Sequence, residues 1–248
     1  RSTLFPYTTL FRSRTGWRLR VRHAVSQLLD YVNRSPHPVV YVDIVGFSRG
    51  AAIARAVSNV MANYIGRGGY TREVKLRFLG LFDTVGTGML RQPEHRAALL
   101  KIPRRTAYAV QAVAAHERRA FFPVASIEPS ASNPGGHSRR REMSFIGAHT
   151  DIGGGYSSGD LSNLTLRWMM SHAQDVGAPM LPLIGRLDEV QMPSLHQQAG
   201  ARLIIDRTGP GDDRLISYPN DPNWDPAAVV FQAGSRSEER RVGKECRS

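Results

Sequence analysis

The sequence predicts an α/β fold in which a mostly parallel sheet is flanked by helices. Apolar, β-branched segments of strand length alternate along the chain with segments in which apolar residues recur at helical spacing. Glycines and polar residues follow the strand segments, at the edge where parallel sheets collect their functional groups. The 248 residues are enough for one domain of this class with a sizeable core.

The predicted elements alternate between helix and strand. Residues 17–33 carry apolar side chains at helical spacing and end before the Pro-His-Pro breaker at 36–38. Residues 39–45 form a buried strand, and residues 49–64 return to helical spacing until the glycine-rich stretch 66–69. The remaining segments are, in chain order, strand 74–82, helix 106–118, polar loop 126–141, strand 143–147, helix 160–175 and a weaker strand 201–205.

The two ends of the chain differ from the rest. Residues 1–13 read forwards and residues 236–248 read backwards can be encoded by complementary codons at every position. We interpret both as non-native, adapter-like peptides translated from opposite strands of one DNA sequence. This leaves residues 14–235 as the natural segment, and we expect neither end to pack against it.

A nucleophile elbow follows the first predicted strand. The segment Gly46-Phe47-Ser48-Arg49-Gly50 has the G-x-S-x-G pattern, in which a strained strand-to-helix turn exposes the serine hydroxyl. We expect Gly46 and Gly50 to be small because the backbone is crowded there. The backbone N–H of Arg49, at the helix start, is the expected oxyanion donor. The alternative is a glycine-rich turn with no chemistry.

An aspartate and a histidine follow two later strands, so Ser48, Asp83 and His149 predict a catalytic triad of α/β-hydrolase type. A hydroxyl is a poor nucleophile near neutral pH, so a histidine must accept its proton and a carboxylate must orient the imidazole. We expect Asp151 to buttress the loop that carries His149. Gly153 and Gly154 are expected to allow close backbone approach beside the site.

Each partner also has a simpler interpretation. Asp83 could cap the turn that follows it, and His149 could be a hydrogen-bonded loop residue or a metal ligand together with Asp151. His116 and His172 are the alternative bases. Both lie in predicted helices, where we expect them on the surface.

Composition excludes several classes. The net charge of +12 falls to +8 without the two end peptides. Much of this excess lies in scattered groups of arginines without interleaved aromatic residues, which argues against nucleic-acid binding and fits a solvated surface or anionic lipid. The one cysteine, Cys246, lies in an end peptide, so we predict neither a disulfide framework nor a thiolate metal site. We also expect no metal ion or cofactor at the site. No apolar run approaches the roughly 18 residues of a membrane span.

Four ordered motifs carry a family resemblance. They are G-F-S-R-G-A-A-I-A-R, F-L-G-L-F-D-T-V-G, H-E-R-R-A-F-F-P and F-I-G-A-H-T-D-I-G-G-G-Y. Together they resemble the bacterial and fungal α/β-hydrolase domain family of unknown function 2235, which includes the type VI secretion phospholipase effectors of the first lipase class. The resemblance implies a serine esterase acting on phospholipid acyl esters, with Ser48 as nucleophile, Asp83 as acid and His149 as base.

The resemblance also implies partners and a missing part. Such an effector is made in the bacterial cytoplasm, delivered to a target cell, and meets a phospholipid or membrane surface and an immunity or secretion-apparatus protein. The family's opening Asp-Gly-Thr-x-Asn strand, which supplies a second oxyanion donor, has no match from residue 14 onward. We therefore expect residues 14–235 to be an N-terminally truncated α/β-hydrolase domain fragment, with its core at the residues 39–177 that the resemblance covers. This fragment alone should be poorly soluble and inactive. The alternatives are an intracellular esterase on small soluble esters and a non-catalytic scaffold.

Overall fold

The computed structural model describes residues 16–68, 72–87, 99–119, 122–129, 139–156 and 160–180. Both end peptides and the weaker strand predicted at 201–205 lie outside the described residues. All the other predicted elements fall within them, at least in part.

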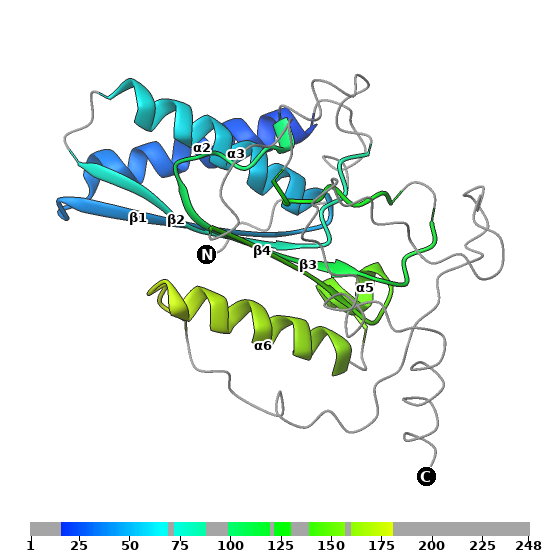
Figure 1. Cartoon of the computed structure of the whole chain (residues 1–248). Coiled ribbons are helices and arrows are strands. Elements are labelled where there is room, and N and C mark those ends of the chain that lie inside the picture. Colours follow the sequence, from blue (N-terminus) through cyan, green and yellow to red (C-terminus); the bar gives the residue numbers. More distant parts are fainter. Residues whose placement is uncertain are drawn as a thin grey trace, which may run out of the picture.

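A parallel sheet forms the centre of the described fold. Its strands lie in the order β1 (Val39–Phe47), β2 (Glu73–Phe82), β3 (Thr106–Ala114) and β4 (Arg140–Phe145). Helices α2 (Gly16–Arg34) and α3 (Arg49–Arg67) cover one face, and α5 (His149–Gly153) and α6 (Asp160–Asp175) cover the other (Figure 1). The predicted α/β class is therefore confirmed. Because neighbouring strands pair in parallel, Ser48, Asp83 and the start of α5 follow their strands at the same edge of the sheet.

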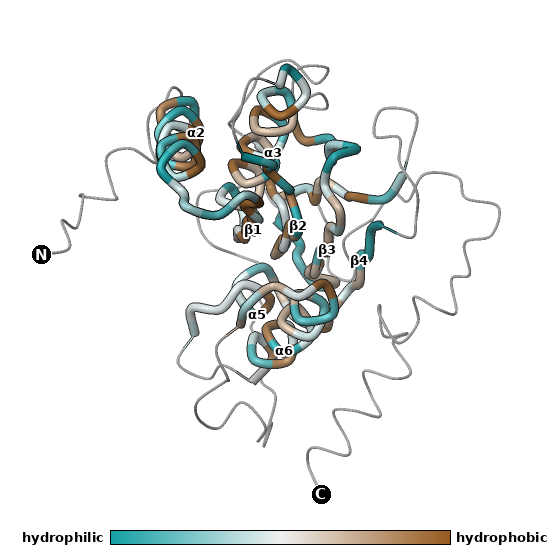
Figure 2. Tube along the Cα trace, turned by 90° about the vertical axis from the view of Figure 1, so that its left-hand side faces the viewer, coloured by the Kyte–Doolittle hydropathy of each residue, from teal (hydrophilic) through white to brown (hydrophobic). Residues whose placement is uncertain are grey.

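Two apolar layers hold the helices to the sheet. On one side Val25 of α2 and Met61 of α3 pack with Val40 and Val42 of β1. On the other side the buried cluster joins both strands and helices, with Phe78, Val110, Ile152 and Met169 among its members. Figure 2, which views the strands nearly end on, shows the two helical layers on opposite sides of the sheet. This packing fixes the edge where the predicted site residues lie.

One predicted helix is a strand. Residues 106–118 were expected to be helical, but β3 occupies Thr106–Ala114 and a turn follows. Every residue from Ala109 to Ala115 is buried. A strand covered on both faces has no alternation of apolar and polar residues, so its periodicity does not separate it from a buried helix. The next strand, β4, also begins earlier than predicted, at Arg140 inside the expected loop.

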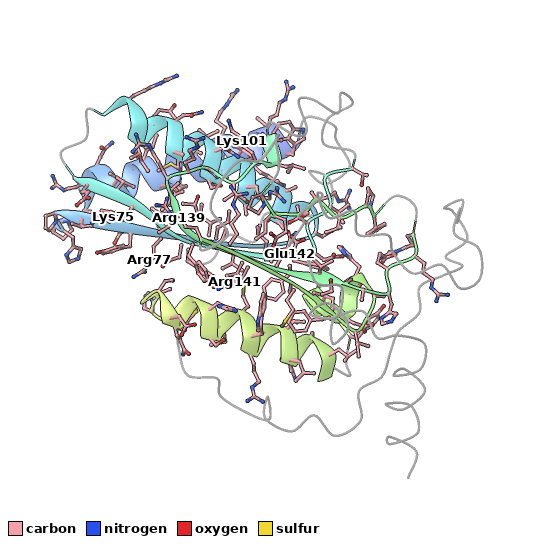
Figure 3. All side chains as sticks on the ribbon, in the orientation of Figure 1. Lys75, Arg77, Lys101, Arg139, Arg141 and Glu142 are labelled. Atoms are coloured by element: carbon pink, nitrogen blue, oxygen red, sulfur yellow. The ribbon has the colours of Figure 1, made fainter. Side chains whose placement is uncertain are left out.

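A buried polar network ties the segment before β4 to the sheet. Glu142, labelled in Figure 3, accepts hydrogen bonds from the Gln111 side chain at 2.7 Å and the Ser126 hydroxyl at 2.8 Å. The Arg55 guanidinium donates to the carbonyls of Ala125 and Ser126 at 2.6 and 3.1 Å. Burial lowers the pKa of Arg55 to about 9, while burial raises the pKa of Glu142. The sequence gives no sign of this network because its members are far apart in the chain.

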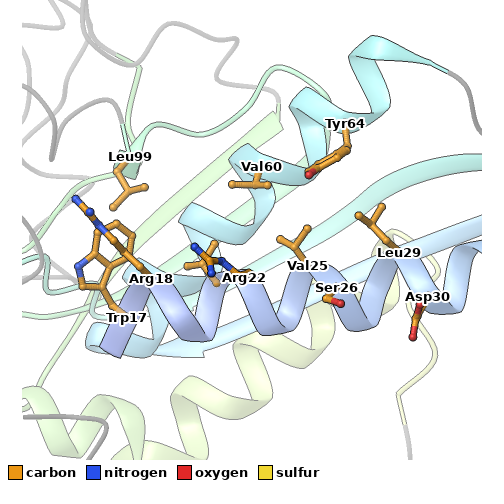
Figure 4. Close-up of a pocket in the computed structure, with 11 residues that line it drawn as sticks. Trp17, Arg18, Arg22, Val25, Ser26, Leu29, Asp30, Val60, Tyr64 and Leu99 are labelled. Atoms are coloured by element: carbon orange, nitrogen blue, oxygen red, sulfur yellow. The ribbon is translucent and has the colours of Figure 1, made fainter. Parts of the chain in front are cut away.

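The helical layer carries a separate groove. It has a volume of about 610 Å³ and lies between α2 and α3, with Trp17, Leu29, Val60 and Tyr64 among its walls (Figure 4). None of the predicted site residues lines it. Among the described helices, none combines the length and apolar character needed to cross a bilayer.

Candidate active site

Ser48 occupies a strained turn between β1 and α3. Its φ of 58° and ψ of −126° are unusual for a residue with a side chain. Its N–H donates to the carbonyl of Phe82 at 2.9 Å, and its carbonyl accepts the N–H of Val85 at 3.3 Å. These two bonds tie the turn to the end of β2. The backbone therefore has the geometry of a nucleophile elbow.

The two glycines of the elbow are not equivalent. A Cβ at Gly46 would lie 2.6 Å from the carbonyl oxygen of Gly50 and 2.8 Å from the Cα of Ala51. Both are backbone atoms of α3, so the crowding cannot be relieved by moving a side chain. A Cβ at Gly50 would meet no atom within 4 Å. The expected need for a small residue holds at Gly46 and is wrong at Gly50.

Asp83 lies fully buried at the end of β2. Its N–H donates to the carbonyl of Ala112 at 2.7 Å, and its Oδ1 accepts the N–H of Ala114 at 3.1 Å. Its other carboxylate oxygen, Oδ2, is 2.6 Å from Nδ1 of His149. Its φ of 42° is also unusual for a residue with a side chain. Strand β3 thus holds the carboxylate in place through the Ala114 N–H, and the carboxylate in turn contacts the imidazole of His149.

His149 begins α5 and is 5 % exposed. Its ring lies against Phe47, with centroids 4.5 Å apart, and nearly at right angles to Phe122, with centroids 4.9 Å apart and planes at 76°. Phe47 immediately precedes Ser48, so the imidazole packs beside the elbow. With Nδ1 bonded to Asp83, Nε2 is the ring nitrogen left to exchange a proton with a substrate or nucleophile.

Asp151 and the neighbouring glycines shape the loop around His149. The Asp151 Oδ2 accepts the N–H of Ala148 at 2.9 Å, which holds the start of α5. A Cβ at Gly153 would lie 2.2 Å from the Phe47 ring, and Gly154 has a φ of 81°. This close packing matches what was expected of Gly153, and Gly154 adopts a conformation that favours glycine.

Neither of the two alternative histidines has a freely exposed side chain. His116 lies in the turn after β3 and not in a helix, because the predicted helix is a strand. It is 7 % exposed, and its Nδ1 accepts the N–H of Gly147 at 3.1 Å. His172 is on α6 as predicted, but its ring contacts Trp168 and its Nδ1 is 2.9 Å from the Tyr108 hydroxyl. Burial lowers the pKa of His172. The expectation of surface exposure is wrong for His116, while the side chain of His172 is partly buried, with 19% of its surface exposed.

The described residues contain no group of three or more His, Cys, Asp or Glu side chains placed to hold a metal ion. The sequence did not indicate the contacts of Phe47, Glu117 and Phe122 with His149. Glu117 and Phe122 lie in the motif H-E-R-R-A-F-F-P, but the sequence alone assigned no role to that motif.

Comparison with known proteins supports the family resemblance. Residues 65–172 match the model of the catalytic domain of Tle1-like type VI secretion phospholipase effectors. This range contains Asp83 and His149, and Ser48 precedes it. No curated protein matches the chain.

Two solved structures are similar to the chain. One is a crystal structure of an uncharacterized protein from Pseudomonas aeruginosa, with 27% identity and a TM-score of 0.50, covering 68% of this chain and 29% of that one. The other is the Tle1 effector bound to the VgrG spike of the type 6 secretion system, with 27% identity and a TM-score of 0.39, covering 58% of this chain and 32% of that one. The chain thus spans less than a third of either protein.

Proposed function

We propose that the chain carries the Ser-His-Asp site of a phospholipase. The premise is that residues 65–172 are similar to the catalytic domain of Tle1-like phospholipase effectors. The observation that carries the proposal is the 2.6 Å contact between His149 and Asp83, placed beside a strained serine turn. A buried carboxylate on Nδ1 keeps the imidazole in the tautomer whose Nε2 can accept a proton. The family match further suggests delivery to a target cell and contact with a secretion-apparatus protein.

The proposed reaction is hydrolysis of a carboxylic ester. The Ser48 hydroxyl attacks the acyl carbonyl while Nε2 of His149 accepts its proton, and Asp83 stabilises the imidazolium. The Arg49 N–H, which has no acceptor within its own helix because it opens α3, would donate to the oxyanion. His149 then protonates the leaving alkoxide. Water, activated by the same imidazole, releases the fatty acid from Ser48.

Labelling with a fluorophosphonate tests the nucleophile. The full-length protein that contains this chain is expected to take one label, at Ser48, because an activated serine displaces fluoride and forms a stable adduct. Ser48→Ala and His149→Ala should both abolish labelling, as measured by intact-protein mass spectrometry. A folded protein that takes no label would favour the non-catalytic scaffold.

Hydrolysis of vesicles tests the substrate. Residues 14–235, which carry most of the positive charge, should be attracted to anionic lipid, so fatty acid should be released faster from anionic than from zwitterionic vesicles. Added salt should reduce the difference, because it screens the attraction. The control is a short soluble ester, whose turnover should respond little to salt. Turnover of short esters alone, with no release from vesicles, would favour an intracellular esterase.

A further inference from the structure

His116 and Glu117, which follow β3, both form hydrogen bonds with the loop that carries His149. His116 and Gly147 exchange two hydrogen bonds: the N–H of His116 donates to the Gly147 carbonyl at 3.0 Å, and the N–H of Gly147 donates to Nδ1 of His116 at 3.1 Å. This double contact sets the position of the loop two residues before His149. The proposed reaction assigns no task to this segment.

Glu117 holds the backbone of His149 itself. Its side chain is 1 % exposed, and its Oε2 accepts the His149 N–H at 3.3 Å. Arg119 binds the same carboxylate through Nε at 2.8 Å, Nη2 at 2.6 Å and its backbone N–H at 2.8 Å. Burial would raise the pKa of Glu117, but the hydrogen bonds and charge of Arg119 and the His149 N–H lower it overall. The carboxylate is therefore charged and fully oriented near neutral pH.

Arg119 connects this carboxylate to the imidazole ring. Its guanidinium lies 3.6 Å from the centre of the Phe122 ring. Phe122 in turn packs nearly at right angles against the His149 ring, which also lies against the ring of Phe47. One guanidinium thus fixes both the anchor of the His149 backbone and an aromatic wall of its side chain.

We propose that Glu117, Arg119 and Phe122 are positioning residues that orient the imidazole of His149, and this rests on the proposed function. The hydrogen bond to Asp83 fixes one atom of the ring and leaves the ring able to swing about that contact. Contacts on the backbone N–H and on the ring remove this freedom, so that the imidazole keeps one orientation beside Phe47, the residue before Ser48. A displacement of about 1 Å at a reacting group can cost about a hundredfold in rate.

Arg119→Lys is the informative variant. Lysine keeps the charge but has neither the planar fork that binds a carboxylate through two nitrogens nor the flat face that stacks on Phe122. We expect kcat on the best ester to fall by about ten- to a hundredfold with KM unchanged. Phe122→Leu should act in the same direction.

The chain offers a closely matched control. Arg77, labelled in Figure 3, binds both carboxylate oxygens of Asp43 at 2.9 and 2.5 Å and lies 4.7 Å from the centre of the Tyr41 ring. Its side chain is 16% exposed, against 15% for Arg119. Arg77→Lys therefore disrupts the same kind of pair, but between β1 and β2 and not at His149. We expect it to leave kcat unchanged.

A spectroscopic readout separates this inference from the proposed function. The Nδ1 proton between His149 and Asp83 should give a downfield proton resonance, and the His149 amide should exchange slowly with deuterium. Both should change in Arg119→Lys and stay as in the wild type in Arg77→Lys. An unlabelled, inactive wild type would overturn the proposed function, yet these two signals would still decide the positioning role. Unchanged signals and an unchanged kcat in Arg119→Lys would overturn the positioning role. A raised KM with no other change would instead make Arg119 a substrate-binding residue.

Discussion

Asp83→Asn is expected to lower kcat by about 10⁴-fold in the full-length protein. The asparagine amide would donate to Nδ1 of His149, which favours the tautomer that carries its proton on Nε2 and cannot accept one from Ser48. The N–H of Ala114 would keep an acceptor in the amide oxygen, so the fold should survive. Ester turnover and thermal unfolding, measured together, separate the chemical loss from a structural one.

Asp151→Asn is the matched control, because Asp151 is also a buried carboxylate and lies in α5, the helix that begins at His149. Its carboxylate accepts the N–H of Ala148 and serves the geometry of α5. An amide oxygen can accept the same bond, so we expect a loss of less than about tenfold. The reverse order of effects would make Asp151 the triad acid and Asp83 a turn residue.

Gly46→Ala is expected to destabilise the fold by about 3 kcal/mol or more. The added Cβ would meet backbone atoms of Gly50 and Ala51 at 2.6 to 2.8 Å, so β1 and α3 would have to separate. Gly50→Ala adds the same methyl group where there is open space within α3, and should stabilise the helix by about 0.5 to 1 kcal/mol. Denaturant unfolding of the two variants measures the difference. Equal stability would mean that the elbow relaxes more easily than its geometry indicates.

The parts of the fold that could be predicted from the sequence are those with local signals. The elbow at Ser48 could be predicted because an apolar strand segment, a glycine and a helical pattern follow one another directly in the sequence. Helix α6 has the predicted bounds, Asp160–Asp175, because one of its faces is polar and exposed. In both cases the pattern that identifies the element lies within the element itself.

What the sequence could not predict depends on contacts between distant residues. Strand β3 is buried on both faces, so its run of alanine and valine has no period that distinguishes it from a helix. The contact of Glu117 with the His149 backbone joins residues 32 apart, and no local pattern announces it. The same holds for Phe47 and Phe122, which both pack against the imidazole of His149.

The contact between Asp83 and His149 joins residues 66 apart, on either side of β3 and β4. Bringing such distant residues together costs chain entropy, which is recovered only once the intervening strands have paired. The elbow, by contrast, is bonded to the end of β2 and needs only the first two strands. A chain that has formed its first two strands would therefore hold the serine but no oriented base. Under the proposed function, competence for chemistry therefore requires all four described strands, because the base is oriented only after β3 and β4 have paired.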